Sequence, residues 1–266
     1  MGWVVFLIPI PYPFDVDKAG GVKIVVCKGV VKPVVRVGAY KDQADMDSIR
    51  VIERNGLRIA VVAFTYGTNG YSPSGSVKIP YLTEETVKSQ MEKAVAAGDF
   101  VMVVVHWGEE NSYAVSDNQK KFASLFAECG ADVIIGSHPH VIQPIEWIEK
   151  ENGEKIPCVY SLGNLVSMMA EEYNMLGGVL SFDIVSKNGG HPCVENILFR
   201  PTVYYYRYSD WFGNKIYYLD KFTPELASSH GVQHYNNTLK LANMYKLAKR
   251  QIAEEYLPAY VTEYAG

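Results

Sequence analysis

Two continuous apolar runs, each followed closely by histidine, restrict most strongly what this chain of 266 residues can fold into. The first is Phe100–His106, and the second is Asp132–Gly136, which leads into His138 and His140. Apolar runs without polar alternation are typical of strands buried on both faces of a parallel sheet. A helix capped by Ser116 or Asp117 and ended by Gly130 is predicted between them. This strand–helix order predicts an α/β fold with a mixed sheet covered by helices.

The remaining pattern extends this sheet and then changes to hairpins. Leu57–Phe64 is predicted as a strand, and a helix is predicted from the N-cap Thr83 to a stop at Gly98. After residue 140 we expect two hairpins, one short strand and a helical tail: 142–149 with 155–161, 178–185 with 193–208, 215–219, and 236–256. The tyrosine-rich run 204–208 can be interpreted as a half-buried strand or as a binding face.

Composition and charge exclude several function classes. The formal charge of -4 gives no basic excess, so no nucleic-acid partner is expected. The apolar runs are too short to insert into a membrane. The segment Trp3–Ile10 has neither a preceding cation nor a small-residue cleavage site, so we interpret it as a short edge strand, not a signal peptide. Four cysteines without CxxC spacing predict no disulfide framework and no zinc knuckle.

Three of the six histidines occupy positions where α/β sheets build ligand sites. His106 ends one buried strand, while His138 and His140 flank Pro139 just after another. Ligand sites in such sheets form beyond the carboxyl ends of the strands. Imidazole binds Zn, Mn, Fe and Ni alike, so the spacing predicts a divalent-metal site without selecting the metal. The alternative is that these are hydrogen-bonded loop histidines.

Three motifs, in order, resemble one known family. They are His106-Trp-Gly-Glu109, then residues 129–144 with Gly136-Ser-His-Pro-His140, then Val159–Leu165 with Ser161-Leu-Gly-Asn164. Together they resemble the CapA-type poly-gamma-glutamate capsule biosynthesis family of bacteria, which is similar to the calcineurin-like metallophosphoesterases. The resemblance implies a mixed two-sheet β-sandwich flanked by helices. Weaker similarity begins near Val37, so we expect a single domain over 37–266 behind an atypical segment, 1–36.

The resemblance also implies roles for individual residues and partners. His106, His138 and His140 would be metal ligands, and the metal would be Zn, Mn or Fe, with full, partial or no occupancy left open. Asn164, Glu109 and Ser137 would contact substrate or the ligands. The substrate would be a small molecule or an anionic polymer. Family members act mainly on the extracytoplasmic face of the membrane, although no signal or anchor is recognised in this sequence.

The departures from the family pattern concern its first motifs. The family's strand ending in Gly-Asp, its Asn-Leu-Glu segment and its Asn-Asn-His are not found, and no histidine precedes His106. We therefore expect an N-terminally truncated fold with an incomplete metallophosphoesterase-type site. Three functions stay open: a capsule-synthesis relative with weak or no catalysis, a mononuclear metal-dependent hydrolase, and a non-catalytic binding scaffold. A sheet lacking its first strands would leave an edge to be paired, so Val4–Ile8 is expected to be an extended, paired strand and the chain a homo-oligomer.

Overall fold

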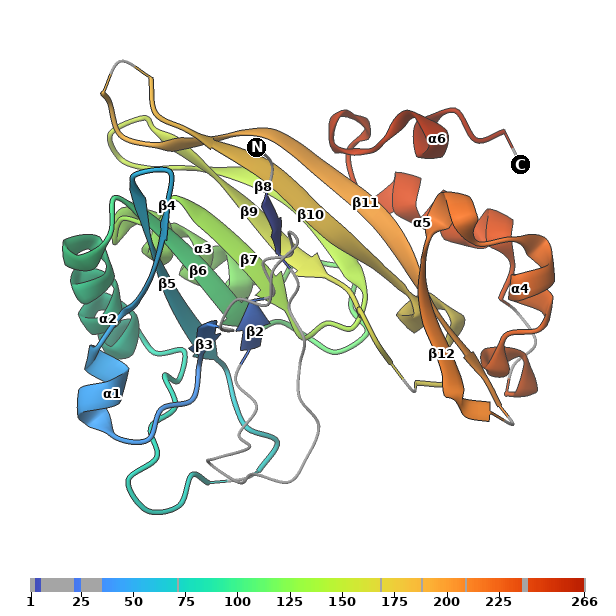
Figure 1. The fold of residues 1–266 in the computed structure, drawn as a ribbon, viewed down its shortest axis with the longest axis horizontal. Coiled ribbons are helices and arrows are strands. Elements are labelled where there is room, and N and C mark those ends of the chain that lie inside the picture. The colour runs from blue at the N-terminus through green and yellow to red at the C-terminus, as the bar shows by residue number, and fades with distance from the viewer. Residues whose placement is uncertain are drawn as a thin grey trace.

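A computed structural model describes residues 3–5, 22–24, 35–70, 72–167, 169–187, 189–208, 210–235 and 239–265 (Figure 1). The strands are β1 (Trp3–Val5), β2 (Val22–Ile24), β3 (Val35–Val37), β4 (Arg50–Arg54), β5 (Leu57–Thr65), β6 (Phe100–His106), β7 (Val133–Ser137), β8 (Ile142–Glu149), β9 (Lys155–Leu162), β10 (Leu176–Val185), β11 (Cys193–Arg207) and β12 (Asp210–Tyr218). The α-helices are α1 (Gln43–Asp47), α2 (Glu84–Ala97), α3 (Asp117–Glu128), α4 (Pro224–Ser228), α5 (Leu241–Gln251) and α6 (Ala259–Thr262). Short 3-10 helices span Glu172–Met175, Leu219–Lys221, Gly231–His234 and Glu254–Tyr256.

A six-stranded mixed sheet, in the order β4-β5-β6-β7-β9-β8, carries the predicted strand–helix units. The four strands β5, β6, β7 and β9 are parallel, and β4 and β8 pair antiparallel at the two edges. One face of this sheet buries Val62 and Val103 in a core shared with α2 and α3, to which Met91 and Phe126 contribute. Both helices begin at the side chains expected to cap them, since Thr83 and Ser116 each accept a hydrogen bond from the backbone of the first turn.

The opposite face of that sheet shares a second core with a four-stranded antiparallel sheet, β1-β10-β11-β12. Val61 and Met102 of the first sheet belong to the same buried cluster as Leu180 and Phe199 of the second. Figure 1 shows the long β10–β11 hairpin crossing the molecule from the upper left to the C-terminal helices on the right. The predicted α/β class, with two sheets and covering helices, is therefore confirmed.

Two predicted elements were wrong in extent. The expected short strand 215–219 is β12, which begins at Asp210 and ends at Tyr218. In its antiparallel pairing with β11, Arg207 is opposite Asp210, and the register shifts between Tyr205 and Arg207. The tyrosine run belongs to that pairing, and Tyr204, Tyr205 and Tyr206 are buried, which rules them out as an exposed binding face. The helical tail is shorter than 236–256, because α5 covers only Leu241–Gln251, and residues 236–238 lie outside the described part.

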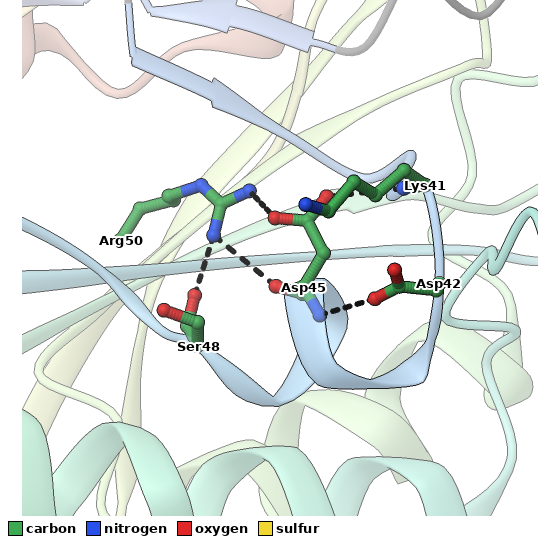
Figure 2. Close-up of polar contacts among 5 residues, drawn as sticks. All are labelled: Lys41, Asp42, Asp45, Ser48 and Arg50. Atoms are coloured by element: carbon green, nitrogen blue, oxygen red, sulfur yellow. Dashed lines mark hydrogen bonds and ion pairs between the residues drawn. The ribbon is translucent and has the colours of Figure 1, made fainter.

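The segment before β5 contains a small helix that the sequence pattern did not predict (Figure 2). Asp42 caps α1 by accepting from the backbone of Asp45, and the side chain of Asp45 pairs with Arg50 at 2.6 Å. Arg50 also donates to the carbonyl of Ser48, which fixes the turn into β4. The sequence did contain a signal for the next turn: Asn55-Gly56, with φ of 51° and 78°, closes a β4–β5 hairpin.

The N-terminal expectations are tested only where the structure describes them. Trp3–Val5 forms β1 and pairs antiparallel with β10, with Val4 opposite Ser181, so this part of the expected strand is extended and paired. Residues 6–8 lie outside the described part. None of the helices in the described residues combines the length and apolar character needed to span a bilayer.

Candidate functional site

The carboxyl ends of three adjacent parallel strands lie level with one another. In the sheet register Thr65 of β5 is opposite His106 of β6, and His106 is opposite Ser137 of β7. The chain leaves the sheet directly after these residues, so Tyr66 and His138 also project at the same edge. This register is the reason why residues more than 30 positions apart in sequence can form one site.

The three predicted histidines come together there, and we call His106, His138 and His140 the histidine cluster. The ring centroids of His106 and His138 are 4.6 Å apart, and those of His138 and His140 are 5.9 Å apart. All three side chains are partly buried. The predicted convergence is confirmed, whereas metal binding by these residues stays a prediction.

The loop that carries His138 and His140 has an unusual backbone. His138 has a φ of 105° and His140 a φ of 60°, a region that costs energy for residues with a Cβ. Three hydrogen bonds hold the loop: Asn111 donates its backbone N–H to the carbonyl of Pro139 at 2.8 Å, and the amides of Asn164 and Asn174 donate to the carbonyl of His140. These hydrogen bonds from the surrounding structure hold the loop in its strained conformation. A strained backbone persists only where its surroundings fix it in this way.

Asn164 fixes the protonation pattern of His140. The amide nitrogen of Asn164 donates to the backbone carbonyl of Asn174 at 3.0 Å, so its Oδ1 is left as an acceptor. His140 Nδ1 lies 2.9 Å from that oxygen and donates to it. The proton of the neutral imidazole is thus on Nδ1, and Nε2 keeps its lone pair, which is the arrangement of a metal-ligating histidine. The contact of Asn164 with His140 is observed, and a role for it beside a metal stays a prediction.

A buried histidine elsewhere in the chain provides the contrast. His230 donates from Nε2 to the carbonyl of Tyr204 at 2.8 Å and accepts at Nδ1 from the backbone of Val232 at 3.0 Å. Both of its nitrogens are used within the fold, which makes it a structural residue. Among the described residues, the ring of His140 has a hydrogen bond at Nδ1 only, so it differs from His230 in this respect.

The electrostatics of the cluster favour neutral imidazoles. Burial, followed by the neighbouring imidazoles of His138 and His140, lowers the pKa of His106 to about 3. Burial also lowers the pKa of His138, with a smaller opposing effect of Glu110. Neutral rings are the form that binds divalent metals, so His106 and His138 are in a ligand-competent state at neutral pH.

The other two expected site residues are less directly placed. Ser137 ends β7, and its hydroxyl donates to the carbonyl of Val105 at 3.3 Å, within the sheet. Glu109 is exposed, and its described hydrogen bond is at the backbone, where its carbonyl accepts from Ser112. The acid that acts on the cluster is its neighbour Glu110, through the charge effect on His138.

Sequence reasoning missed the contribution of β5. Thr65 contacts Nδ1 of His106 at 3.1 Å, and the ring of Tyr66 lies 4.5 Å from that of His138. The rule that ligands bind beyond the carboxyl ends of strands applies to β5 as much as to β6 and β7. Applied there, it would have found both residues.

The donor set suits one divalent transition metal better than two. Three neutral imidazoles are a known ligand set for a single zinc ion. The rings pack face against edge, however, and among the described residues no group of three or more His, Cys, Asp or Glu side chains is arranged to hold a metal ion as it stands. For these imidazoles to hold a metal together, their rings would have to change orientation. A bridging carboxylate for a second metal is not part of this described cluster.

Comparison with known proteins places the chain in a family. The model of the bacterial capsule synthesis protein family PGA_cap matches residues 31–169, just over half of the chain, and this match includes the whole histidine cluster. The chain belongs to this capsule synthesis family. The PGA biosynthesis protein CapA of Bacillus subtilis is 35% identical over 114 residues, covering 42% of this chain and 29% of that protein. The capsule biosynthesis protein CapA of Bacillus anthracis is 34% identical over 137 residues, 49% of this chain and 32% of that protein.

The chain thus spans about a third of the length of these two capsule proteins. A crystal structure of a hypothetical protein from Thermus thermophilus is 15% identical, with a TM-score of 0.37 over 57% of this chain and 60% of that one, which is too low to support an argument. For this member of the capsule synthesis family, the site must therefore be argued from its own residues.

Proposed function

We propose that the chain acts in the synthesis of poly-gamma-glutamate capsule and that its histidine cluster binds one divalent transition metal. The observation that carries the proposal is the hydrogen bond from Nδ1 of His140 to Asn164, which leaves the lone pair of Nε2 free beside the neutral imidazoles of His106 and His138. Family membership and the names of the two Bacillus relatives support the role in capsule synthesis. An anionic polymer or a precursor of it is the proposed substrate class.

We further propose that the two sheets form the flanked β-sandwich of the metallophosphoesterases. Support comes from the buried cluster shared by β5, β6 and β7 with β10 and β11, and from α2 and α3 on the outer face of the larger sheet. In such a sandwich the carboxyl ends of the parallel strands open at one edge, where the histidine cluster lies.

The chain's own residues would contribute orientation and charge state. When bound, a divalent metal supplies Lewis-acid polarisation of a phosphoryl or related oxygen. His106, His138 and His140 would hold it as neutral ligands, and Asn164 keeps His140 oriented through the bond at Nδ1. Glu110, which is exposed beside His138, places a negative charge at the rim of the cluster.

The first test measures metal binding by the full chain. Isothermal titration with zinc and with manganese is expected to show about one equivalent bound, and His138→Ala and His140→Ala are expected to lose this binding because each removes one of three ligands. His234→Ala is the matched control, since His234 is exposed and stacks on Tyr208 outside the cluster. Wild-type protein that binds neither ion would leave the scaffold function as the better account.

The second test asks about catalysis on a generic substrate. We expect hydrolysis of a simple phosphodiester at or near the uncatalysed rate, because the described cluster offers no bridging carboxylate to a second metal and two-metal chemistry depends on one. The measurement is the rate with and without added zinc or manganese. A metal-dependent rate that His138→Ala abolishes would contradict this expectation and establish a mononuclear hydrolase.

A further inference from the structure

Thr65, the last residue of β5, and Tyr66, which follows it, touch the histidine cluster, and β5 lies on the other side of β6 from β7 and its His138–His140 loop. Thr65 is opposite His106 in the parallel ladder, and the backbone N–H of Tyr66 donates to the carbonyl of His106 at 2.9 Å. Backbone pairing therefore holds this end of β5 directly against His106. Neither residue belongs to the three motifs on which the family resemblance rests.

Thr65 supplies an acceptor to His106. The hydroxyl of Thr65 lies 2.7 Å from the carbonyl of Gly67 and donates its single proton there. The contact of 3.1 Å between Thr65 Oγ1 and His106 Nδ1 must then have the imidazole as donor. His106 consequently carries its proton on Nδ1 and keeps the lone pair on Nε2, as His140 does through Asn164.

Tyr66 supplies packing to His138. Its ring centroid lies 4.5 Å from that of His138 and 5.4 Å from that of His106, while 45% of the residue stays exposed. Among the described residues, the ring of His138 packs against three other rings, those of Tyr66, His106 and His140. Packing by Tyr66 thus takes the place that a hydrogen bond has at the other two histidines.

We propose that Thr65 and Tyr66 are positioning residues of the histidine cluster, Thr65 by fixing the tautomer of His106 and Tyr66 by holding the ring of His138. The contacts of Thr65 and Tyr66 exist without a metal. The inference rests on the proposed function only in the purpose it gives these contacts, which is to hold metal ligands in position. It makes the site a joint product of the ends of β5, β6, β7 and β9, with one supporting group for each imidazole: Thr65, Tyr66 and Asn164.

The tautomer half is tested on metal-free full-length protein by nitrogen NMR of the imidazole rings at neutral pH. Thr65→Val keeps the shape of the side chain and removes the acceptor, so His106 is expected to gain signal from protonated Nε2. Thr65→Ser restores the hydroxyl and is expected to give the wild-type pattern. Thr202→Val is the matched control, because the buried hydroxyl of Thr202 has no hydrogen-bond partner among the described residues. A Thr65→Val spectrum identical to wild type would overturn this half.

The packing half is tested by comparing Tyr66→Phe with Tyr66→Leu. Phenylalanine keeps the ring, so the ring-proton shifts of His138 and the zinc affinity are expected to stay near wild type. Leucine removes the ring, and the zinc affinity is expected to fall by about 10- to 100-fold, the usual effect of losing a group that supports a ligand. Tyr208→Leu removes a half-exposed tyrosine that packs on His234 and serves as the control. Equal loss in the Phe and Leu variants would show that the hydroxyl matters, not packing, and would overturn this half.

The two measurements separate failure of this inference from failure of the proposed function. If wild-type protein binds no zinc but Thr65→Val and Tyr66→Leu still change the spectra of His106 and His138, positioning stands and the metal proposal fails. If wild type binds zinc and both variants bind it equally well, with unchanged spectra, positioning fails and the metal proposal stands.

Discussion

At the scale of residues, His230 and His140 differ in where their two ring nitrogens find partners. His230 uses both within the fold, whereas the ring of His140 has, among the residues that the structure describes, a hydrogen bond at Nδ1 only, to Asn164. This difference between the two histidines depends on single hydrogen bonds, which cannot be predicted from the spacing of residues in the sequence.

The depressed pKa of His106 predicts a specific dependence of stability on pH. In the unfolded chain this imidazole takes up a proton near pH 6.5, but in the folded chain only near pH 3. The unfolded state therefore binds more protons between these values, and the free energy of unfolding should fall as the pH falls from about 6.5 to about 3.

His106→Gln removes this contribution. Urea unfolding of chelator-treated protein is expected to show a shallower loss of stability on acidification, by as much as about 1.4 kcal/mol per pH unit. His234→Gln, at an exposed ring, should leave the slope as in wild type. Parallel curves for wild type and His106→Gln would contradict the assigned burial effect.

At the scale of elements, β7 requires glycine at position 136 because the packing leaves no room for a Cβ there. A Cβ at Gly136 would lie 2.0 Å from the carbonyl oxygen of Tyr160 and 2.5 Å from Nε1 of Trp107. These two atoms are themselves joined by a buried hydrogen bond of 2.9 Å. The side chain of Trp107 thus crosses directly over β7, one residue before Ser137 and the loop of the cluster.

Gly136→Ala is expected to lower the free energy of unfolding by about 3 kcal/mol, since the methyl group must displace the backbone of β9 or break the Trp107 hydrogen bond. The measurement is denaturant unfolding at pH 7. Gly67→Ala is the matched control, because a Cβ there meets nothing within 4 Å and its backbone has no positive φ. A variant as stable as wild type would show that β7 and β9 can separate without cost.

The sequence predicted strands and helices well where a local cause fixes them. β6 and β8 have the expected bounds, and Ser116 forms a capping box with Gln119. Gly98 ends α2 as expected but for another reason: its φ is -126°, and a Cβ would lie 2.7 Å from that of Ala60, so close packing requires glycine there. Gly130, with φ of 93°, is the left-handed stop that the pattern implied.

What the sequence could not supply was long-range register. That Thr65 is opposite His106 follows from the pairing of β5 with β6, and the bulged pairing that lengthens β12 follows from its packing on β11. Both depend on contacts between separated segments. The histidines could be found because they follow recognisable buried runs, whereas Tyr66 and Asn174 act through positions that only the folded sheet defines.

At the scale of the whole molecule, the β10–β11 hairpin ties the second sheet to the first. His191, near the tip of this hairpin, donates from Nε2 to the buried carboxylate of Asp132 at 2.6 Å, just before β7. The other oxygen of Asp132 accepts from the backbone of Val101 at 2.7 Å. Burial raises the pKa of Asp132, and the bond from His191 opposes that rise. One contact therefore joins the far end of the hairpin to the central sheet.

His191→Ala is expected to lower the free energy of unfolding by about 1–2 kcal/mol, because it leaves one oxygen of a buried carboxylate without its partner. Lys155→Ala breaks the pair with Glu149, in which both side chains are more than half exposed, and should cost less than about 0.5 kcal/mol. Thermal or urea unfolding of both variants makes the comparison. Equal effects would mean that the hairpin tip contributes no more than an ordinary surface pair.

The left-handed backbone at His138 and His140 makes the needs of stability differ from the needs of the proposed site, which requires imidazoles at these two positions. Selection for thermal stability alone would favour glycine at both positions, because glycine reaches these angles without strain. A redesign guided by stability alone would therefore tend to replace both histidines and remove the proposed site. Conversely, grafting the three imidazoles onto a relaxed loop would reproduce the residues without their arrangement. Transfer of the proposed site to another protein would therefore require the strained turn around Pro139 as well as the three side chains.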